Sequence, residues 1–186
     1  LTTLVEEKLG YLPRGVAHDS TFALPVVRDI ARALSLVSRR GGHLQRAVER
    51  GEHVLVSPGG TRESLRPWCR AYEVNWGPSR GFARLAVELQ IPVIPVGAAG
   101  VDDLLIGLFD GHRAGELLGL RGKVAGPWLG LGLGGFFPFA MPFPVRIRQH
   151  IGPPLKDHIG AGRGPEVVEQ LFADTRAAGQ TQIDDA

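Results

Sequence analysis

The sequence predicts a single α/β domain in which a mixed sheet is flanked by helices. Two apolar segments, 53–57 and 91–96, have the length and composition of short buried strands. Each follows a segment whose apolar residues recur at helical spacing, 43–50 and 80–90. This alternation of helix and strand is typical of α/β domains with at least partly parallel strands.

The composition fits one compact globular domain and excludes several other classes of protein. The chain has 186 residues, 44% of them hydrophobic and 22% charged, which allows a substantial core without disulfides. Its one cysteine, Cys69, rules out a disulfide framework and a cysteine-built metal site, and it fits a reducing compartment. The net charge of only +2 argues against a nucleic-acid-binding protein. Nothing in the sequence calls for a metal.

Three helices are expected in the first half of the chain. Helical spacing of apolar residues predicts the first over 26–37 and the second over 43–50, with Gly51 just past its end. Ser79 is placed to cap the third, over 80–90. In the second and third helices, the residues expected to face the core are Leu44, Ala47, Val48, Phe82, Leu85, Ala86 and Leu89.

The remaining elements are strands and one final helix. The strand over 53–57 ends in the sharp turn Pro58-Gly59-Gly60. The two prolines within 91–96 favour an edge or irregular strand, because proline cannot donate to a sheet. Alternating apolar and basic residues over 145–151 predict a one-sided strand. Proline at the first helical position then opens a helix over 165–178.

An uncharged stretch runs from Val124 to Val145 and allows three interpretations. Its 22 residues are enough to cross a bilayer. Its five glycines and four prolines oppose a spanning helix, because they break the hydrogen-bond ladder where no water can replace it. A buried loop and strand, or a surface that meets lipid through its aromatic side chains, are the alternatives. We expect contact with lipid at a bilayer surface, without crossing.

The most informative motif is the segment Val54–Glu63, with the sequence VLVSPGGTRE. A strand delivers a turn of small residues whose backbone N–H groups can point at an anion, and such turns favour phosphate. Arg62 adds a guanidinium that matches phosphate oxygens in a bidentate manner, and Thr61 adds a hydroxyl. The alternative is an ordinary turn with a solvated Arg-Glu pair. It is not a nucleotide P-loop, because the GxxxxGK[ST] spacing is absent.

This motif and the segments after it resemble the glycerolipid (phospholipid/glycerol) acyltransferases, in the diacylglycerol-acyltransferase-like branch. Residues 57–63 (SPGGTRE) are similar to the family's third sequence block, and Pro92–Val96 to its fourth. The segment between them, GFARLA at 81–86, also fits. Arg39 falls where the second block has its arginine, and the resemblance covers roughly residues 11–156.

The catalytic motif of that family is missing from this chain. Family members use His-x4-Asp, in which histidine takes the proton of the acceptor hydroxyl and aspartate orients it. None of the six histidines is followed by aspartate at that spacing. His18 and Asp19 are adjacent and would point to opposite faces of a strand, so they do not replace it. We expect the motif to lie upstream of Leu1, which makes the chain an N-terminally truncated fragment that is inactive alone.

The resemblance implies transfer of a fatty acyl group from acyl-CoA or acyl-carrier protein to a hydroxyl of a glycerolipid or related lipid, with no other cofactor. It implies an acyltransferase-like domain over 1–160, followed by a C-terminal helix and tail over 161–186. It also implies a cytoplasmic protein peripherally associated with a membrane surface, and an apolar wall over 127–143. The substrate-binding residues that it implies are Gly59, Gly60, Thr61, Arg62, Glu63 and Arg39.

Two alternatives from other functional classes stay open at this point. The first is a non-catalytic protein of the same fold that binds lipid or acyl chains and truly lacks the catalytic pair. The second is a phosphate-sugar or nucleotide-binding α/β domain, which rests on the Pro-Gly-Gly turn alone and predicts no dependence on lipid.

Overall fold

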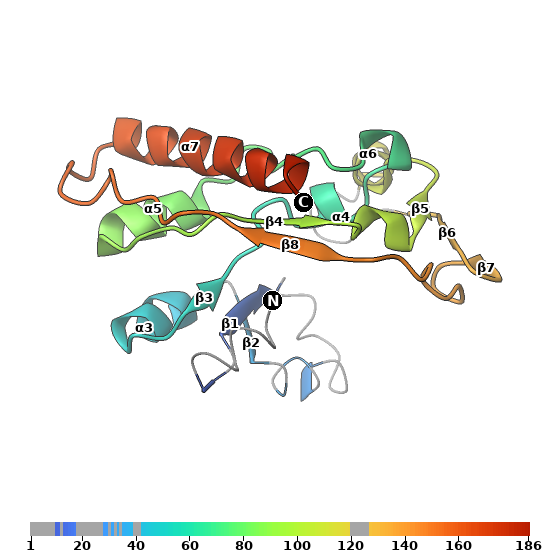
Figure 1. The fold of residues 1–186 in the computed structure, drawn as a ribbon, viewed down its shortest axis with the longest axis horizontal. Coiled ribbons are helices and arrows are strands. Elements are labelled where there is room, and N and C mark those ends of the chain that lie inside the picture. The colour runs from blue at the N-terminus through green and yellow to red at the C-terminus, as the bar shows by residue number, and fades with distance from the viewer. Residues whose placement is uncertain are drawn as a thin grey trace. The chain divides into compact units, whose positions relative to one another are not determined.

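The structure is a computed structural model that describes residues 10–11, 13–17, 28–29, 31, 33, 35–38, 42–119 and 127–186. The chain divides into two compact units, an N-terminal unit of residues 1–58 and a C-terminal unit of residues 59–186 (Figure 1). The elements of the N-terminal unit are β1 (Arg14–Ala17), β2 (Leu36–Ser38), α3 (His43–Glu49) and β3 (Val54–Leu55). Those of the C-terminal unit are α4 (Thr61–Ser64), η2 (Trp68–Arg70), α5 (Gly81–Leu89), β4 (Val96–Ala99), η3 (Asp102–Leu104), β5 (Ile106–Gly107), α6 (Gly111–Leu117), β6 (Gly130–Gly132), β7 (Gly135–Phe136), β8 (Arg148–Ile151) and α7 (Pro165–Asp184).

The N-terminal unit contains a small parallel sheet with the strand order β2-β1-β3. Gly15 of β1 lies opposite Leu36, and a Cβ at this glycine would come within 2.5 Å of the Leu36 side chain. The strands therefore approach closely because Gly15 has no side chain. The prediction of parallel strands in an α/β fold is confirmed, although the strands among the described residues form three small sheets rather than one.

The predicted helix over 26–37 is right only in its first part. Arg28, Asp29, Ala31 and Ala33 are helical, but the chain turns at Ser35, whose φ is 57°, and enters β2 at Leu36. Residues 36–38 form a strand although their apolar residues have helical spacing, because the strand can pair with β1. Tertiary context of this kind overrides local propensity.

The next two elements follow the predicted order, but the second is less buried than the sequence predicts. The helix predicted over 43–50 is confirmed as α3, with Ala47 buried and Gly51 in the left-handed region just after its end. The strand predicted over 53–57 is only the two residues of β3, and Leu55 is exposed. The expectation of a buried strand is wrong here, because β3 is an edge strand of its sheet.

The core of the C-terminal unit lies between α5 and α7. Small side chains on α5 let the two helices approach closely, and the aromatic ring of Phe172 fills the space between them. The buried residues of this core cluster are Ala83, Ala86, Val87, Val168, Leu171 and Phe172. Of the residues expected to face the core, Ala86 is buried, and Phe82 is half-buried and packs against the cluster.

Arg80, not Ser79, is the N-cap residue of α5, so the predicted cap is wrong. The Arg80 side chain is held by tertiary contacts instead. Its Nε donates to the Glu169 carboxylate at 2.9 Å, and its guanidinium lies 3.6 Å from the centre of the Phe172 ring. These contacts join the start of α5 to α7.

The strand predicted over 91–96 begins only at Val96, as β4. Pro92 and Pro95 have no N–H to donate, so Val93 forms just an isolated antiparallel bridge with Leu155. β4 then pairs with β8 in antiparallel orientation. All four residues of β8 are exposed, so the one-sided strand predicted over 145–151 is shorter than expected and buries neither face.

The final helix, α7, starts at Pro165 as predicted but continues six residues past 178, to Asp184. Thr175 and Gly179 are buried in its second half, and Gly179 faces the indole of Trp76. α7 packs on α5, β4 and β8, and in Figure 1 it forms one layer over the two strands. Residues 161–186 thus help to form the core of the C-terminal unit.

The part of the uncharged stretch that the structure describes, 127–145, forms strands and turns. β5, β6 and β7 make an antiparallel sheet in that order. Within the described part of the chain, no helix is long and apolar enough to cross a membrane. Most side chains from Leu133 to Pro144 are exposed, so the interpretation as a buried loop does not hold for this segment.

Candidate functional site

The candidate site is the turn that follows β3 and runs into α4. Hydrogen bonds within the turn close it, from the N–H groups of Arg62 to Gly59 O at 3.1 Å and of Ser64 to Gly60 O at 3.0 Å. Gly60 has a φ of 51°, in the left-handed region that glycine adopts without strain. Among the described residues, the N–H groups of Gly60 and Thr61 have no hydrogen-bond acceptor. These two donors are free to meet a ligand.

Glu63 points inward and fastens the turn. Its Oε1 accepts a hydrogen bond from the N–H of Asn75 at 3.1 Å, and its carboxylate lies against Gly59. A Cβ on Gly59 would collide with this carboxylate, so the glycine is needed for Glu63 to fold back. Burial raises the pKa of Glu63, which its hydrogen bonds only partly offset. In this structure Glu63 therefore supports the turn.

Arg62 points away from the turn toward α6. Its Nη2 lies 3.7 Å from Glu116 Oε1, and His112 Nε2 faces the same oxygen at 3.3 Å. The Arg62 side chain also lies against Gly77, where a Cβ would come within 2.7 Å of its Nε. The Arg62 side chain keeps about a third of its surface exposed. Arg62 is thus held in one place but remains accessible.

The start of α6 is joined to the same turn. The N–H of Gly111 donates to Leu65 O at 2.9 Å, just after α4. Asp110 caps α6 by accepting a hydrogen bond from the N–H of Arg113 at 3.0 Å. These contacts fix the position of Glu116 relative to Arg62. Sequence analysis missed His112 and Glu116, although their spacing of four residues on a helix is a signal that could have paired them.

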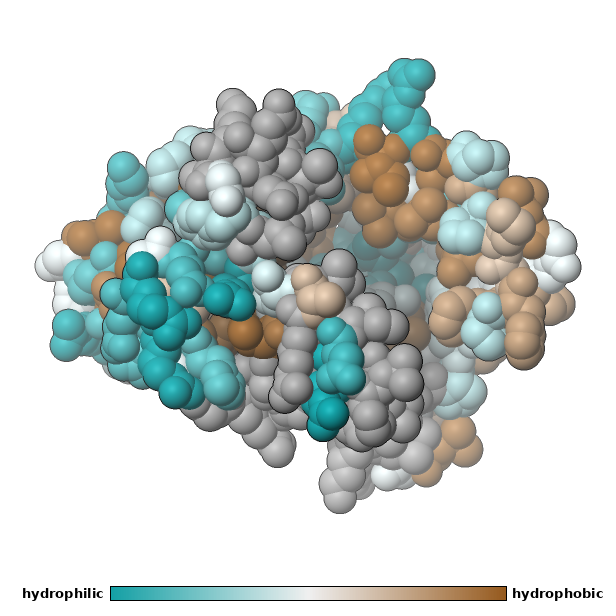
Figure 2. Space-filling model, turned by 90° about the horizontal axis from the view of Figure 1, so that it is seen from below, coloured by the Kyte–Doolittle hydropathy of each residue, from teal (hydrophilic) through white to brown (hydrophobic). Residues whose placement is uncertain are grey.

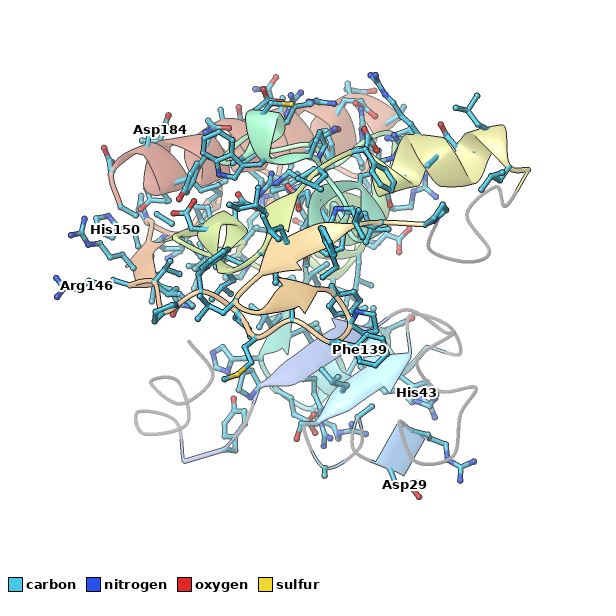
Figure 3. All side chains as sticks on the ribbon, turned by 90° about the vertical axis from the view of Figure 1, so that its right-hand side faces the viewer. Asp29, His43, Phe139, Arg146, His150 and Asp184 are labelled. Carbon is cyan, nitrogen blue, oxygen red and sulfur yellow. The ribbon has the colours of Figure 1, made fainter. Side chains whose placement is uncertain are left out.

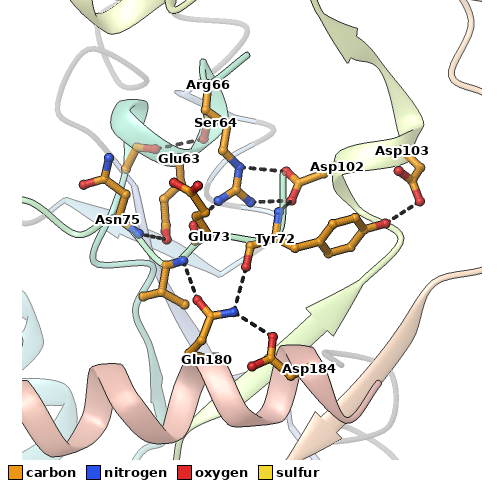
Figure 4. Close-up of polar contacts among 12 residues, drawn as sticks. Glu63, Ser64, Arg66, Tyr72, Glu73, Asn75, Asp102, Asp103, Gln180 and Asp184 are labelled. Atoms are coloured by element: carbon orange, nitrogen blue, oxygen red, sulfur yellow. Dashed lines mark hydrogen bonds and ion pairs between the residues drawn. The ribbon is translucent and has the colours of Figure 1, made fainter. Parts of the chain in front are cut away.

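A polar network supports the segment behind the turn (Figure 4). Arg66 forms a largely buried ion pair with Asp102, whose carboxylate also accepts a hydrogen bond from the N–H of Tyr72 at 2.8 Å. Gln180 of α7 accepts from the N–H of Val74 and donates to the carbonyl oxygen of Tyr72, both at 2.9 Å. The network ties residues 66–76 to η3 and α7. Asn75, whose N–H donates to Glu63, therefore lies on a segment that is held in place.

The described part of the site can hold an anion but does not show a catalytic pair. It offers the Arg62 guanidinium and two free N–H groups, a combination that suits phosphate oxygens. Arg39 and His18 lie outside the described residues, as does the side chain of Thr61. The described residues contain no group of three histidine, cysteine or acidic side chains that could hold a metal ion. Cys69 is exposed and lies apart from this turn in sequence.

Comparison with known proteins gives the family context for this geometry. Residues 2–99 match the acyltransferase family, which is just over half of the chain and includes the turn at 58–64. The chain is 30% identical to the human "DGAT1/2-independent enzyme synthesizing storage lipids" over 94% of the chain and 49% of that relative. The chicken protein of the same name is 28% identical, over 90% of the chain and 46% of the relative.

A more distant similarity covers a smaller segment. The chain is 32% identical to the chloroplastic phytyl ester synthase 1 of Arabidopsis thaliana over 33% of the chain and 9% of that relative. The chain thus spans about half the length, or less, of the curated relatives that it matches. No solved structure shows a significant match.

Proposed function

The chain belongs to the acyltransferase family, and we propose that it is part of an enzyme that esterifies a lipid hydroxyl with a fatty acyl group. The donor would be acyl-CoA or acyl-carrier protein, and the acceptor a glycerolipid or related lipid. Relatives named for storage-lipid synthesis and phytyl ester synthesis support an ester product with a lipid acceptor. The protein would work on the cytoplasmic side of a membrane surface, where such acceptors are found.

The reaction proposed for the intact protein is attack of the acceptor hydroxyl on the thioester carbonyl. A base takes the hydroxyl proton, the new C–O bond forms, and the C–S bond breaks to release the thiol. No His-x4-Asp occurs in these 186 residues to supply the base and its orienting partner. We therefore assign this chain the binding of an anionic group of donor or acceptor, and we expect no turnover from it alone.

One observation carries this assignment: a turn that Glu63 holds from inside presents two free N–H groups, and the Arg62 guanidinium extends from the same turn toward α6 and stays accessible. Coenzyme A and the head group of phosphatidate both carry phosphate, which matches these donors. The inward position of Glu63 favours anion binding, because it leaves no carboxylate of the turn facing the ligand. A non-catalytic protein would use the same turn for binding, so binding and turnover need separate tests.

The binding test is the affinity for coenzyme A of the wild type and of Arg62→Lys, measured by calorimetry. Lysine keeps the charge but loses the planar pair of donors. A charge-assisted hydrogen bond contributes roughly 1.5–3 kcal/mol, so about a tenfold or larger loss of affinity is expected. Arg84→Lys is the matched control, because Arg84 is an exposed arginine of α5 in the same unit. Equal affinity of wild type and Arg62→Lys would assign Arg62 to a solvated ion pair with no role in binding.

A further inference from the structure

The segment 133–143, between β6 and the approach to β8, displays apolar side chains that nothing in the described chain covers. Phe139 is 93% exposed and Met141 70%, while Phe136 and Phe137 are about half exposed. We call these residues, with Leu133, the aromatic hairpin surface. Figure 2 shows hydrophobic side chains gathered at the right-hand end of the molecule, where β6 and β7 lie. Isolated exposed apolar residues are ordinary, but a contiguous set marks an interaction surface.

The backbone under this surface is firmly held. Phe137 N donates to Gly130 O at 2.8 Å, and Leu133 and Met141 form a bridge. Phe143 N donates to Leu104 O of η3 at 2.9 Å, which fastens the end of the segment. A Cβ at Gly132 would lie 2.5 Å from Met141 O, so the two sides of the hairpin are in close contact. The apolar side chains are therefore presented outward by a hydrogen-bonded frame.

The chemistry of the surface points to lipid rather than to another protein. From Leu133 to Phe143 no side chain can donate a hydrogen bond, and the sole acceptor is the weak thioether sulfur of Met141. The indole N–H of Trp128, the one polar side-chain group between 127 and 145, donates to Arg66 O at 3.3 Å inside the unit. Protein interfaces carry about ten hydrogen bonds and a polar rim, which this surface does not offer. Acyl chains need no such partners.

The charged residue that follows this segment in the sequence is basic, which favours an anionic membrane. Arg146 is the third residue after the segment, is exposed, and forms no ion pair among the described residues. In Figure 3, Arg146 and His150 extend from one edge of the molecule beside β8, and Phe139 lies apart from them, nearer the middle of the view. Basic side chains beside an apolar surface are attracted to anionic head groups over about a Debye length.

We propose that the aromatic hairpin surface docks the protein on an anionic lipid surface by inserting Phe139, Met141 and their neighbours among the acyl chains. This rests on the proposed function, because a long-chain acceptor has to be met at the membrane. To the proposed function, this proposal adds which segment of the protein contacts the membrane. Arg146 would stay at the level of the head groups, so the segment lies in the interface and does not cross it.

The test is co-sedimentation with vesicles of phosphatidylcholine mixed with phosphatidylglycerol. The double variant Phe139→Ser, Met141→Ser should bind about tenfold more weakly or worse, because two large apolar side chains no longer leave water. Its thermal melting should be unchanged, since both side chains are already exposed in the free protein. The matched control is Ile94→Ser, Ile151→Ser, two half-exposed residues on or beside β4 and β8, which should bind as the wild type does.

Arg146→Gln should weaken binding about fivefold on the mixed vesicles and little on phosphatidylcholine alone. The proposal is overturned if the Phe139, Met141 variant binds like the wild type or if the isoleucine control weakens equally. It is also overturned if the first variant changes the oligomeric state and leaves vesicle binding intact. Arg62→Ala separates this proposal from the proposed function: it should lose coenzyme A binding and keep vesicle binding.

Discussion

At the scale of single residues, the turn at 58–64 divides its functions among neighbours. Glu63 is turned inward to the backbone N–H of Asn75, whereas Arg62, next to it in sequence, reaches outward to Glu116. The sequence motif made both residues candidates for binding substrate. Only the contacts assign support to Glu63 and leave Arg62 as the cation that a ligand can reach.

Glu116 is placed to compete with the proposed anionic ligand for Arg62. Its carboxylate lies 3.7 Å from the Arg62 guanidinium and about half of its surface is exposed. Glu116→Gln should therefore strengthen coenzyme A binding about two- to fivefold, in keeping with the small contribution of an exposed ion pair. Glu88→Gln, which removes an exposed carboxylate of α5, is the control for net charge. Weaker binding in Glu116→Gln would mean that this carboxylate positions Arg62 and does not compete for it.

Burial raises the pKa of Glu63, so its contribution to stability depends on pH. The unfolded chain releases the Glu63 proton at the ordinary glutamate pKa, and the folded protein releases it only at a higher pH. Stability is therefore lost as pH rises through this window. Glu63→Gln has no proton to release and should be more stable than the wild type at neutral pH, with the difference vanishing in acid. Urea unfolding between about pH 4 and about pH 8 measures this.

Glu63→Ala is the companion variant for that experiment. It leaves the N–H group of Asn75 without its acceptor, which should cost about 1–3 kcal/mol of unfolding free energy across the pH range. A difference between wild type and Glu63→Gln that does not change with pH would contradict the role of burial.

At the scale of elements, the C-terminal unit depends on close approach between backbones. β4 passes under α7 at Gly97, where a Cβ would come within 2.4 Å of the Gln182 backbone. β4 also pairs with β8, so β8 and α7 contact this strand on different sides of Gly97. Side-chain packing between α5 and α7 then fills the core above this contact.

Gly97→Ala should lower the free energy of unfolding by about 1–3 kcal/mol, because the added methyl group meets backbone that cannot move alone. Gly81→Ala is the matched control. Gly81 begins α5 with nothing within 4 Å of its Cβ position, so alanine there should be neutral or stabilising by up to about 1 kcal/mol. Chemical denaturation of the wild type and both variants measures these changes in the free energy of unfolding. A Gly97→Ala protein as stable as the wild type would show that β4 and α7 can separate at little cost.

At the scale of the whole molecule, this chain corresponds to about half of its human and chicken relatives. The family match over 2–99 includes the turn at 58–64, while α7 and the aromatic hairpin surface lie beyond it. Anion binding and lipid contact are therefore proposed for different segments of one C-terminal unit.

The chain by itself should show no acyl transfer above background, because none of its histidines belongs to a His-x4-Asp motif. Release of thiol from an acyl-CoA would be followed with glycerol, monoacylglycerol, diacylglycerol and lysophosphatidate as acceptors. Coenzyme A binding in the same preparation is the control that the protein is folded. Clear turnover that is lost in His18→Ala would contradict this expectation and would move the catalytic site into this chain.

Much of the local structure follows from the sequence because it depends on neighbouring residues. Helical spacing predicts α3 and α5, proline at the first helical position predicts the start of α7, and the Pro-Gly-Gly turn appears where glycine and proline require it. The wrong predictions of secondary structure concern residues whose conformation depends on contacts with segments distant in the sequence. Leu36–Ser38 leave a helical pattern to pair with β1, and the strand expected at 91 starts at Val96, where a partner strand and free N–H groups coincide.

The sequence by itself determined the α/β class and the acyltransferase family, and it predicts Arg62 as the cation of the site, since each rests on residue types at short spacing. Tertiary structure alone decided that Glu63 faces inward, that Glu116 and His112 stand beside Arg62, and that the segment 133–143 is exposed. The reason is physical. Burial and ion pairing depend on which residues distant in the sequence lie close together in the folded chain, and a local pattern of residues does not specify those contacts.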